Sequence, residues 1–242
     1  MIYIEQPAFL PWLAFCEALV ACDVVALYDD VQFEDGGWQN RNRIKTKTGT
    51  QWITVPVVKK HGQLIREARI ADAFAPETLL RTLRMAYGRT AFFDETMDVL
   101  APPLNAGHLF LADLNAEILH RIRDALGARC DLRSTSGMAL PPTGRIERIA
   151  TVCERTGQFV LWAGSGTRGY LDTAPLTRAG ITVLWNEYAP RHPVYPQTWA
   201  FRGFMPALSV VDAACNLGWA GLRTLLLDEF TTYRSQLNGV TG

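Results

Sequence analysis

The chain has 242 residues, of which 48% are hydrophobic, and its 24 basic and 24 acidic side chains give a formal net charge of zero. A chain of this length buries enough surface to fold without a disulfide or metal as a staple, and no apolar run approaches the roughly 20 residues that a membrane-spanning helix needs. We expect a single α/β domain over residues 1–242, because no linker or repeat divides the sequence.

Residues 1–30 predict a strand, a helix and a second strand. The first strand, at residues 2–5, ends before Pro7, since the residue that precedes a proline avoids helical geometry. Pro11 can begin a helix, and residues 12–22 have the apolar spacing of one. The unbroken apolar run at residues 24–28 is typical of a parallel strand that is buried on both faces.

Residues 36–58 have the pattern of a small antiparallel β-hairpin. Gly36 and Gly37 form a turn, and residues 48–50 have the composition of a hairpin turn before the β-type run at residues 51–55. We therefore expect this segment to be an antiparallel insertion in a sheet that is otherwise mainly parallel.

The rest of the chain alternates helices with strands. Apolar spacing predicts helices over residues 76–88, 113–126, 146–156 and 170–178, and strands over residues 130–133, 159–163 and 181–185. Repeated units of this kind favour an α/β fold with a mainly parallel, doubly wound, Rossmann-like sheet.

The cysteines and histidines do not have the spacing of a metal site. The five cysteines are an odd number without a CxxC pair, and the four histidines are far apart in the sequence. Buried free thiols in a reducing compartment fit this pattern, and the N-terminus lacks the basic and apolar regions of a signal peptide. We expect a cytoplasmic protein that has no structural metal.

Polar residues follow the predicted strands in four separate parts of the chain. Because ligands of an open parallel sheet bind beyond the carboxyl ends of its strands, we expect these loops to meet at one end of the sheet and to form the ligand site. The residues concerned are Gln6, the group Asp29, Asp30 and Gln32, then Ser134, and finally Ser165.

The loop at residues 164–170 is the clearest candidate for binding an anion. Its glycines allow close approach of the backbone, and Ser165 and Thr167 supply hydroxyl groups. The N-terminus of the expected next helix adds free N–H groups, and the guanidinium of Arg168 suits phosphate or carboxylate. Tyr170 ends the loop. The alternative is an ordinary strand-to-helix turn.

Asp29 and Asp30 follow a strand, where one of them can hold a hydroxyl, an amine or a magnesium ion. Adjacent residues of a strand point to opposite faces, so both reach one ligand only if the chain turns there. At least one of the two can instead serve as a turn or helix cap.

Residues 41–69 contain eight basic side chains and one acidic side chain, a net charge of +7. This excess indicates either a solvated hairpin face or a surface for an anionic ligand, such as a phosphate, a nucleotide, a sugar nucleotide or a carrier protein. Asn40, Arg41 and Lys45 lie in a polar run that is either a recognition loop or a solvated loop.

Residues 192–197 form a rigid segment, because prolines lie on both sides of Tyr195. His192 is a candidate general base, since an imidazole titrates near neutral pH; the alternative is a structural histidine. Gln197 and Trp12 are further candidates for contact with the ligand.

Six segments resemble the WbqC-like protein family in order and in spacing. The family pattern has Gly-Tyr after the first tryptophan, where this chain has Leu13 and then Ala14-Phe15, and a lysine where Arg168 stands. The positive charge at that position is kept. The segments are residues 6–12 (QPAFLPW), 28–33 (YDDVQF), 38–45 (WQNRNRIK), 52–57 (WITVPV), 164–172 (GSGTRGYLD) and 192–197 (HPVYPQ).

A partial resemblance links residues 1–33 and 165–171 to the pantothenate synthetase and nucleotidyltransferase-like class, which activates carboxylates with ATP. The histidines of that class are missing here, and residues 9–12 (FLPW) occupy their place. The resemblance therefore implies the fold of that class but not its usual route of adenylation.

The resemblance to the WbqC-like family implies a role in the biosynthesis of bacterial polysaccharide (O-antigen) or of specialised metabolites. It suggests an amide-forming acyl or aminoacyl transferase that acts on an amine-bearing sugar or metabolite. From the residues themselves we expect an anionic, phosphate-bearing donor held by residues 164–170 and the basic segment, with Asp30 or His192 taking the amine proton. The alternative is a non-catalytic protein that binds a nucleotide or sugar nucleotide. No cofactor is indicated. Nucleic acid is disfavoured, because the net charge is zero and we expect Trp38 and Trp52 to pack in the core or hairpin.

Overall fold

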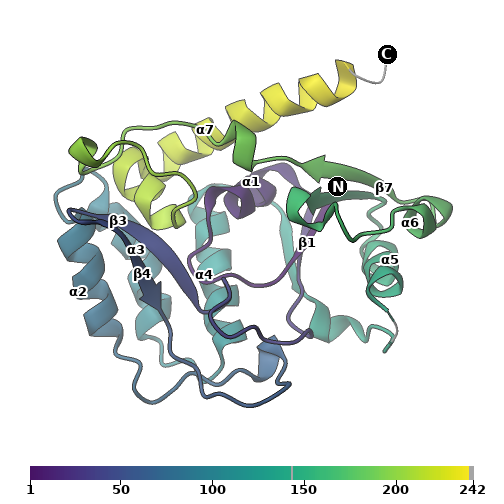
Figure 1. Cartoon of the computed structure of the whole chain (residues 1–242), viewed down its shortest axis with the longest axis horizontal. Helices are drawn as coiled ribbons and strands as arrows, with labels where there is room; N and C mark the ends of the chain where they lie inside the picture. The colour runs from purple at the N-terminus through teal and green to yellow at the C-terminus, as the bar shows by residue number, and fades with distance from the viewer. Residues whose placement is uncertain (143, 240–242) are drawn as a thin grey trace.

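Five parallel strands form the central sheet in the computed structural model, which describes residues 1–142 and 144–239 (Figure 1). The strand order is β5-β2-β1-β6-β7, and every neighbouring pair is parallel. The predicted parallel α/β sheet is therefore confirmed. The strands are β1 (Ile2–Glu5), β2 (Val24–Leu27), β5 (Asp131–Ser134), β6 (Val160–Gly164) and β7 (Thr182–Asn186).

The chain changes direction across the sheet at its central strand. From β1 it proceeds to β2 and later to β5 on one side, and then crosses to β6 and β7 on the other side. The boundary between β1 and β6 is thus the topological switch point, where open α/β sheets form a crevice at the carboxyl ends of their strands.

Alternating side chains of each strand enter two separate hydrophobic cores, because successive residues of a strand point to opposite faces. Tyr3 and Val25 pack into the larger core, whereas Ile2 and Val24 pack into the smaller one. Figure 1 shows α5 and α6 beside the sheet on one side of the molecule. The helices that supply the larger core are α1 (Leu13–Ala21), α2 (Pro76–Tyr87), α3 (Phe93–Asn105), α4 (Leu111–Ala125) and α7 (Val210–Gly239), and those of the smaller core are α5 (Arg145–Thr156) and α6 (Ala174–Arg178).

The predicted hairpin insertion is present as β3 (Arg41–Thr46) and β4 (Gly49–Thr54), an antiparallel pair separate from the main sheet. The Asn42 side chain fixes it to the body by donating a hydrogen bond to the carbonyl of Leu10 over 2.8 Å. In Figure 1 the hairpin lies next to α2 and α3, on the other side of the molecule from α5 and α6.

Two helices, α3 and α7, have no counterpart among the predicted elements. Helix α3 contains Pro102 and Pro103 in its last turn, and such residues usually mark the end of a helix rather than its interior. Helix α7 is interrupted at Gly218, where φ is +69°, and a Cβ there would lie 2.8 Å from the Phe92 ring. This bend separates two helical segments of different direction and obscures their common periodicity.

The helix predicted over residues 170–178 is shorter than expected and covers only Ala174–Arg178. Asp172 accepts a hydrogen bond from the backbone N–H of Ala174 over 3.0 Å, and Pro175 stands in the first turn. Both features start a helix at this point, because an aspartate satisfies a free N–H group and a proline needs no donor there. The loop at residues 164–170 consequently contains a short 3₁₀ turn, Ser165–Thr167, and does not lead directly into a helix N-terminus.

Within residues 1–142 and 144–239, no helix combines the length and the apolar character that a membrane span requires.

Candidate functional site

A cavity of about 480 Å³ lies at the switch point, beyond the carboxyl ends of β1, β2 and β6. Its wall includes the first two turns of α5 and an apolar lining that contains Ile4, Leu161 and Leu171. Cavities of this size and position commonly hold small molecules. The predicted site residues that line it are Gln6, Asp30, Gln32, Thr167 and Tyr170.

Glu5 brings a carboxylate with a perturbed pKa into this cavity. It is the last residue of the central strand β1 and accepts a hydrogen bond from the backbone N–H of Gln6 over 2.9 Å. Burial raises the pKa of Glu5 above its ordinary value, and the hydrogen bonds from Gln6 and from the Tyr3 hydroxyl oppose that rise. A carboxylate with a raised pKa in a cavity suits general acid–base chemistry. The sequence analysis did not single out Glu5.

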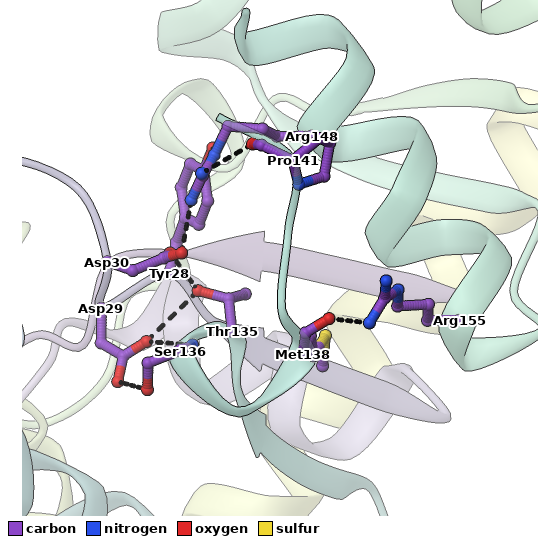
Figure 2. A network of polar contacts seen from close by, with 9 residues as sticks. All are labelled: Tyr28, Asp29, Asp30, Thr135, Ser136, Met138, Pro141, Arg148 and Arg155. Atoms are coloured by element: carbon purple, nitrogen blue, oxygen red, sulfur yellow. Dashed lines mark hydrogen bonds and ion pairs between the residues drawn. The ribbon is translucent and has the colours of Figure 1, made fainter. Parts of the chain in front are cut away.

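Asp30 is held in the cavity wall by a network that joins β2 to α5 (Figure 2). Its Oδ2 accepts a hydrogen bond from Arg148 over 2.5 Å, and its Oδ1 lies 2.6 Å from the Thr135 hydroxyl. Arg148 also donates to the Tyr28 hydroxyl over 2.8 Å and to the carbonyl of Pro141 over 3.2 Å. These contacts engage both oxygens of the Asp30 carboxylate and hold Arg148 against the wall of the cavity.

Asp29 has a structural role in the same network, as Figure 2 shows. It is buried, and its two oxygens accept hydrogen bonds from the Ser136 backbone N–H (2.8 Å) and the Ser136 hydroxyl (2.6 Å). The Thr135 hydroxyl lies within 3.2 Å of Asp29 as well as close to Asp30. The two aspartates therefore converge on one threonine, because the chain turns directly after β2, which ends at Leu27.

Arg145 is the cation at the mouth of the cavity. It is exposed and forms no ion pair within residues 1–142 and 144–239, and its guanidinium lies 4.8 Å from the centre of the Tyr170 ring. Tyr170 is also exposed and lines the cavity. The arginine and the ring together offer a charged group and a flat surface to a ligand.

Three further residues of the predicted strand-end site are not part of the cavity lining. Ser134 ends β5 at the edge of the sheet, and Ser165 is exposed to solvent. Arg168 forms an ion pair with Glu187 and lies 5.6 Å from the centre of the Trp185 ring. All four predicted loops do follow parallel strands at the same end of the sheet. Only some of their side chains line the cavity.

A second polar cluster is buried between the hairpin and α7. The Lys45 ammonium donates to the carbonyl of Gly203 over 2.6 Å and to Gln197 over 3.1 Å. The Tyr195 hydroxyl donates to Asp212 Oδ2 over 2.9 Å, while Asp212 Oδ1 has no hydrogen-bond partner in the described part of the chain. Lys45, Tyr195 and Gln197, which were predicted as ligand contacts, thus meet one another and not the cavity.

Burial raises the pKa of Asp212 to about 6, although the hydrogen bond from Tyr195 opposes this rise. Burial also lowers the pKa of the Lys45 ammonium, and the attraction of Asp212 counteracts that change. Both groups are therefore less easily charged in the folded protein than in water.

Asp212 should make the folded protein less stable as the pH rises. Its pKa of about 6 exceeds the ordinary 3.8, so the folded state binds this proton more tightly than the unfolded chain does. The resulting stabilisation is complete below about pH 4 and is lost as the pH rises through about 6, a change of up to about 3 kcal/mol.

We therefore expect wild type to lose stability relative to Asp212→Asn as the pH rises from about 4 to about 7. Urea unfolding at several pH values measures this difference. Asp35→Asn is the control, because the Asp35 side chain is exposed. A difference that stays constant with pH would contradict a raised pKa for Asp212.

His192 is held by backbone groups on both sides of its ring. Its Nδ1 lies 2.9 Å from the carbonyl of Pro193, and its Nε2 accepts the backbone N–H of Ala207 over 3.2 Å. Burial lowers the pKa of His192, which favours the neutral ring that these contacts need. His192 does not line the cavity.

The remaining predicted site residues make structural contacts. Trp12 packs edge-on against Tyr188, and the buried Asn40 side chain donates to the carbonyl of Val55 over 3.0 Å. Arg41 stacks on Trp52 in the hairpin.

The five cysteines are all buried free thiols. Burial raises the pKa of each of them, to about 11 for Cys130 and Cys153 and to about 12 for Cys215, which disfavours the reactive thiolate. Among the described residues, no three His, Cys, Asp or Glu side chains are grouped closely enough to hold a metal ion.

Comparison with known proteins places the chain in a family. The model of the WbqC-like protein family matches residues 6–224. The chain belongs to the WbqC-like protein family. A similar protein is Rv1507c of Mycobacterium tuberculosis, described as an uncharacterized protein, which is 34% identical over 220 residues that cover 90% of this chain and 94% of that protein. No solved structure matches the chain significantly. The part matched by the WbqC-like model includes Gln6, Asp30 and Tyr170 of the cavity, whereas Glu5 directly precedes it.

Proposed function

We propose that this WbqC-like protein transfers an acyl or aminoacyl group to a small amine that carries an anionic group, and that the reaction takes place in the cavity at the switch point. One observation carries the proposal: the cavity holds the Glu5 carboxylate, whose pKa is raised, together with the Arg145 guanidinium, which has no ion pair among the described residues. Membership of the family is consistent with a biosynthetic role.

Glu5 would act as the general base. The amine nitrogen attacks the carbonyl carbon of the activated acyl group, a C–N bond forms, and the bond to the leaving group breaks with its electron pair. The nitrogen must then lose a proton, and Glu5 Oε would accept it. A raised pKa makes Glu5 a stronger base than an ordinary carboxylate, which improves this transfer near neutral pH.

Arg145 would hold the anionic group of the ligand. The guanidinium binds phosphate or carboxylate through two parallel hydrogen bonds, and it is not occupied by a carboxylate of the described chain. This assignment moves the anion-binding role from Arg168 to Arg145, because Arg168 is paired with Glu187 outside the cavity lining.

A calorimetric titration with an amino-sugar phosphate, and with the same amino sugar without phosphate, tests this role. We expect Arg145→Gln to weaken binding of the phosphorylated ligand on the order of 10-fold or more, since a charge-assisted hydrogen bond contributes about 1.5–3 kcal/mol. Binding of the unphosphorylated amine should change little. Arg168→Gln is the matched control and should bind both ligands as wild type does.

Equal losses of affinity for the phosphorylated ligand in the Arg145 and Arg168 variants would show that the general positive charge of the surface attracts the anion, and not a contact in the cavity. An unchanged affinity in Arg145→Gln would remove the anion site from this proposal.

A non-catalytic binding protein is the second candidate. It is favoured by the way in which the structure uses Asp30 and His192, because both side chains are occupied by contacts within the protein. Such a protein would show the Arg145 effect on binding but would form no amide product with any activated acyl donor.

A further inference from the structure

Two exposed tryptophans lie at the hairpin, Trp52 in β4 and Trp38 in the turn before β3, where the sequence analysis expected both to pack in the core or the hairpin. Trp38 is 51% exposed and Trp52 is 44% exposed. Their ring centres are 5.5 Å apart and the rings are tilted by 41°, so they form one continuous aromatic surface. Large apolar side chains that are exposed together mark an interaction site more often than single ones do.

Two arginines are interleaved with these rings. The Arg41 guanidinium lies 4.3 Å from the centre of the Trp52 ring, and that of Arg43 lies 5.8 Å from both ring centres. Neither arginine has an ion-pair partner in residues 1–142 and 144–239. The Nε atoms of both are buried and lack a hydrogen-bond partner among the described residues. We name Trp38, Arg41, Arg43 and Trp52 the Trp/Arg platform.

The platform is rigid, which allows it to bind without a large loss of conformational entropy. Arg43 and Trp52 are directly paired across the two hairpin strands. The carbonyl of Trp38 accepts the backbone N–H of Phe9 over 3.0 Å, and the carbonyl of Arg43 accepts the backbone N–H of Ser209 over 2.9 Å. The Arg43 guanidinium also donates to the carbonyl of Ala207 over 3.3 Å. The backbone on both sides of the aromatic surface is thus tied to the body of the protein.

We propose that the Trp/Arg platform binds unpaired nucleotides of a single-stranded nucleic acid. Flat bases stack on tryptophan, and arginine neutralises the phosphates between them. A single strand alternates bases and phosphates, so it matches both the aromatic rings and the guanidinium groups of the platform. A neutral sugar would leave the arginines unused, and an acidic protein surface would leave the aromatic faces without a flat partner. Residues 41–69 carry a net charge of +7, which the rest of the chain balances with −7, and this local excess attracts a polyanion to the segment that contains Arg41, Arg43 and Trp52.

The experiment is a fluorescence anisotropy titration with a labelled single-stranded oligoadenylate RNA of about ten nucleotides. We expect Trp38→Ala and Trp52→Ala each to weaken binding by about 5- to 100-fold, and Trp52→Phe to recover part of the loss, because phenylalanine keeps an aromatic face. Arg41→Gln should lower the salt dependence of the logarithm of the affinity by about 0.7.

Phe159→Ala is the matched control, since Phe159 is 49% exposed and lies beside the first residue of β6, far from the hairpin in sequence. It should bind the RNA as wild type does. Thermal melting of each variant confirms that it is folded, as expected for substitutions of exposed side chains.

Three competitors distinguish the sources of the ligand. A blunt duplex of the same sequence should compete poorly, because its bases are already stacked. Competition by AMP at the same nucleotide concentration as the RNA would overturn the proposal of a strand in favour of a free nucleotide. Equal competition by polyglutamate would overturn it in favour of an acidic protein, and unchanged binding in both tryptophan variants would overturn it altogether.

Discussion

Glu5→Gln is expected to reduce kcat by about 100- to 10,000-fold while leaving the binding of the amine substrate almost unchanged. The amide of glutamine keeps the size and the hydrogen-bonding capacity of the side chain but cannot accept a proton, and general bases contribute about this factor to catalysis. The measurement is the rate of amide formation from an activated acyl donor and an amino-sugar phosphate, together with calorimetric binding of that amine.

The pH dependence gives a second readout of the same group. The lower limb of the wild-type rate profile should lie above the ordinary carboxylate value of 4.5, because burial raises the pKa of Glu5. Glu5→Asp should keep a limb of this kind, and Glu154→Gln, an exposed glutamate of α5, should be indistinguishable from wild type. Turnover by Glu5→Gln at the wild-type rate would mean that Glu5 is not the base.

Arg191→Ala is expected to have the largest effect on stability, a loss of about 3–5 kcal/mol of unfolding free energy. Arg191 donates to both oxygens of Glu17, over 2.6 and 2.5 Å, and Glu17 is fully buried in α1. Removal of the arginine leaves a buried carboxylate without its charged partner, and it also removes the stacking of the guanidinium on Tyr188 and Tyr233.

Chemical denaturation of three variants separates these contributions. Glu17→Gln/Arg191→Ala should recover part of the loss, because no unpaired charge remains buried. Lys59→Ala breaks an exposed pair with Asp35 and should cost less than about 1 kcal/mol. The deficit of Arg191→Ala should also shrink at low pH, since a protonated Glu17 is buried at smaller cost. An equal loss in the single and double variants would assign the effect to packing alone.

Much of the sheet could be predicted from local patterns, because its strands are short apolar runs that end at polar loops. The hairpin was recognisable from its turn composition. Helix α7 was not, because the left-handed conformation of Gly218 interrupts its periodicity. Its second segment is held by a tertiary contact, the stacking of Phe230 on Trp162 at a centroid distance of 4.8 Å, which no local pattern reveals.

The end of the sheet at which the site lies could also be predicted, since it follows from the parallel topology alone. The side chains that line the cavity could not. Glu5 resembles an ordinary strand end, and Arg145 and Arg148 resemble the solvated face of an amphipathic helix. The sequence does contain one signal of a buried charge, because Glu17 is the only charged residue in the apolar helix Leu13–Ala21. Glu17 belongs to a buried ion pair with Arg191, and not to a ligand site.

The strand order also determines when the cavity can exist during synthesis. Ile2 of β1 pairs with Leu161 of β6, so the two sides of the crevice come from opposite ends of the first two-thirds of the chain. A nascent polypeptide that has emerged only as far as α5 has Glu5 and Asp30 but lacks Gly164, Thr167 and Tyr170. Contacts between such distant residues close slowly, because a long loop must be ordered before they form. A small molecule that requires the whole crevice therefore cannot act as a template for the early steps of folding, and it can stabilise only a chain whose sixth strand is in place.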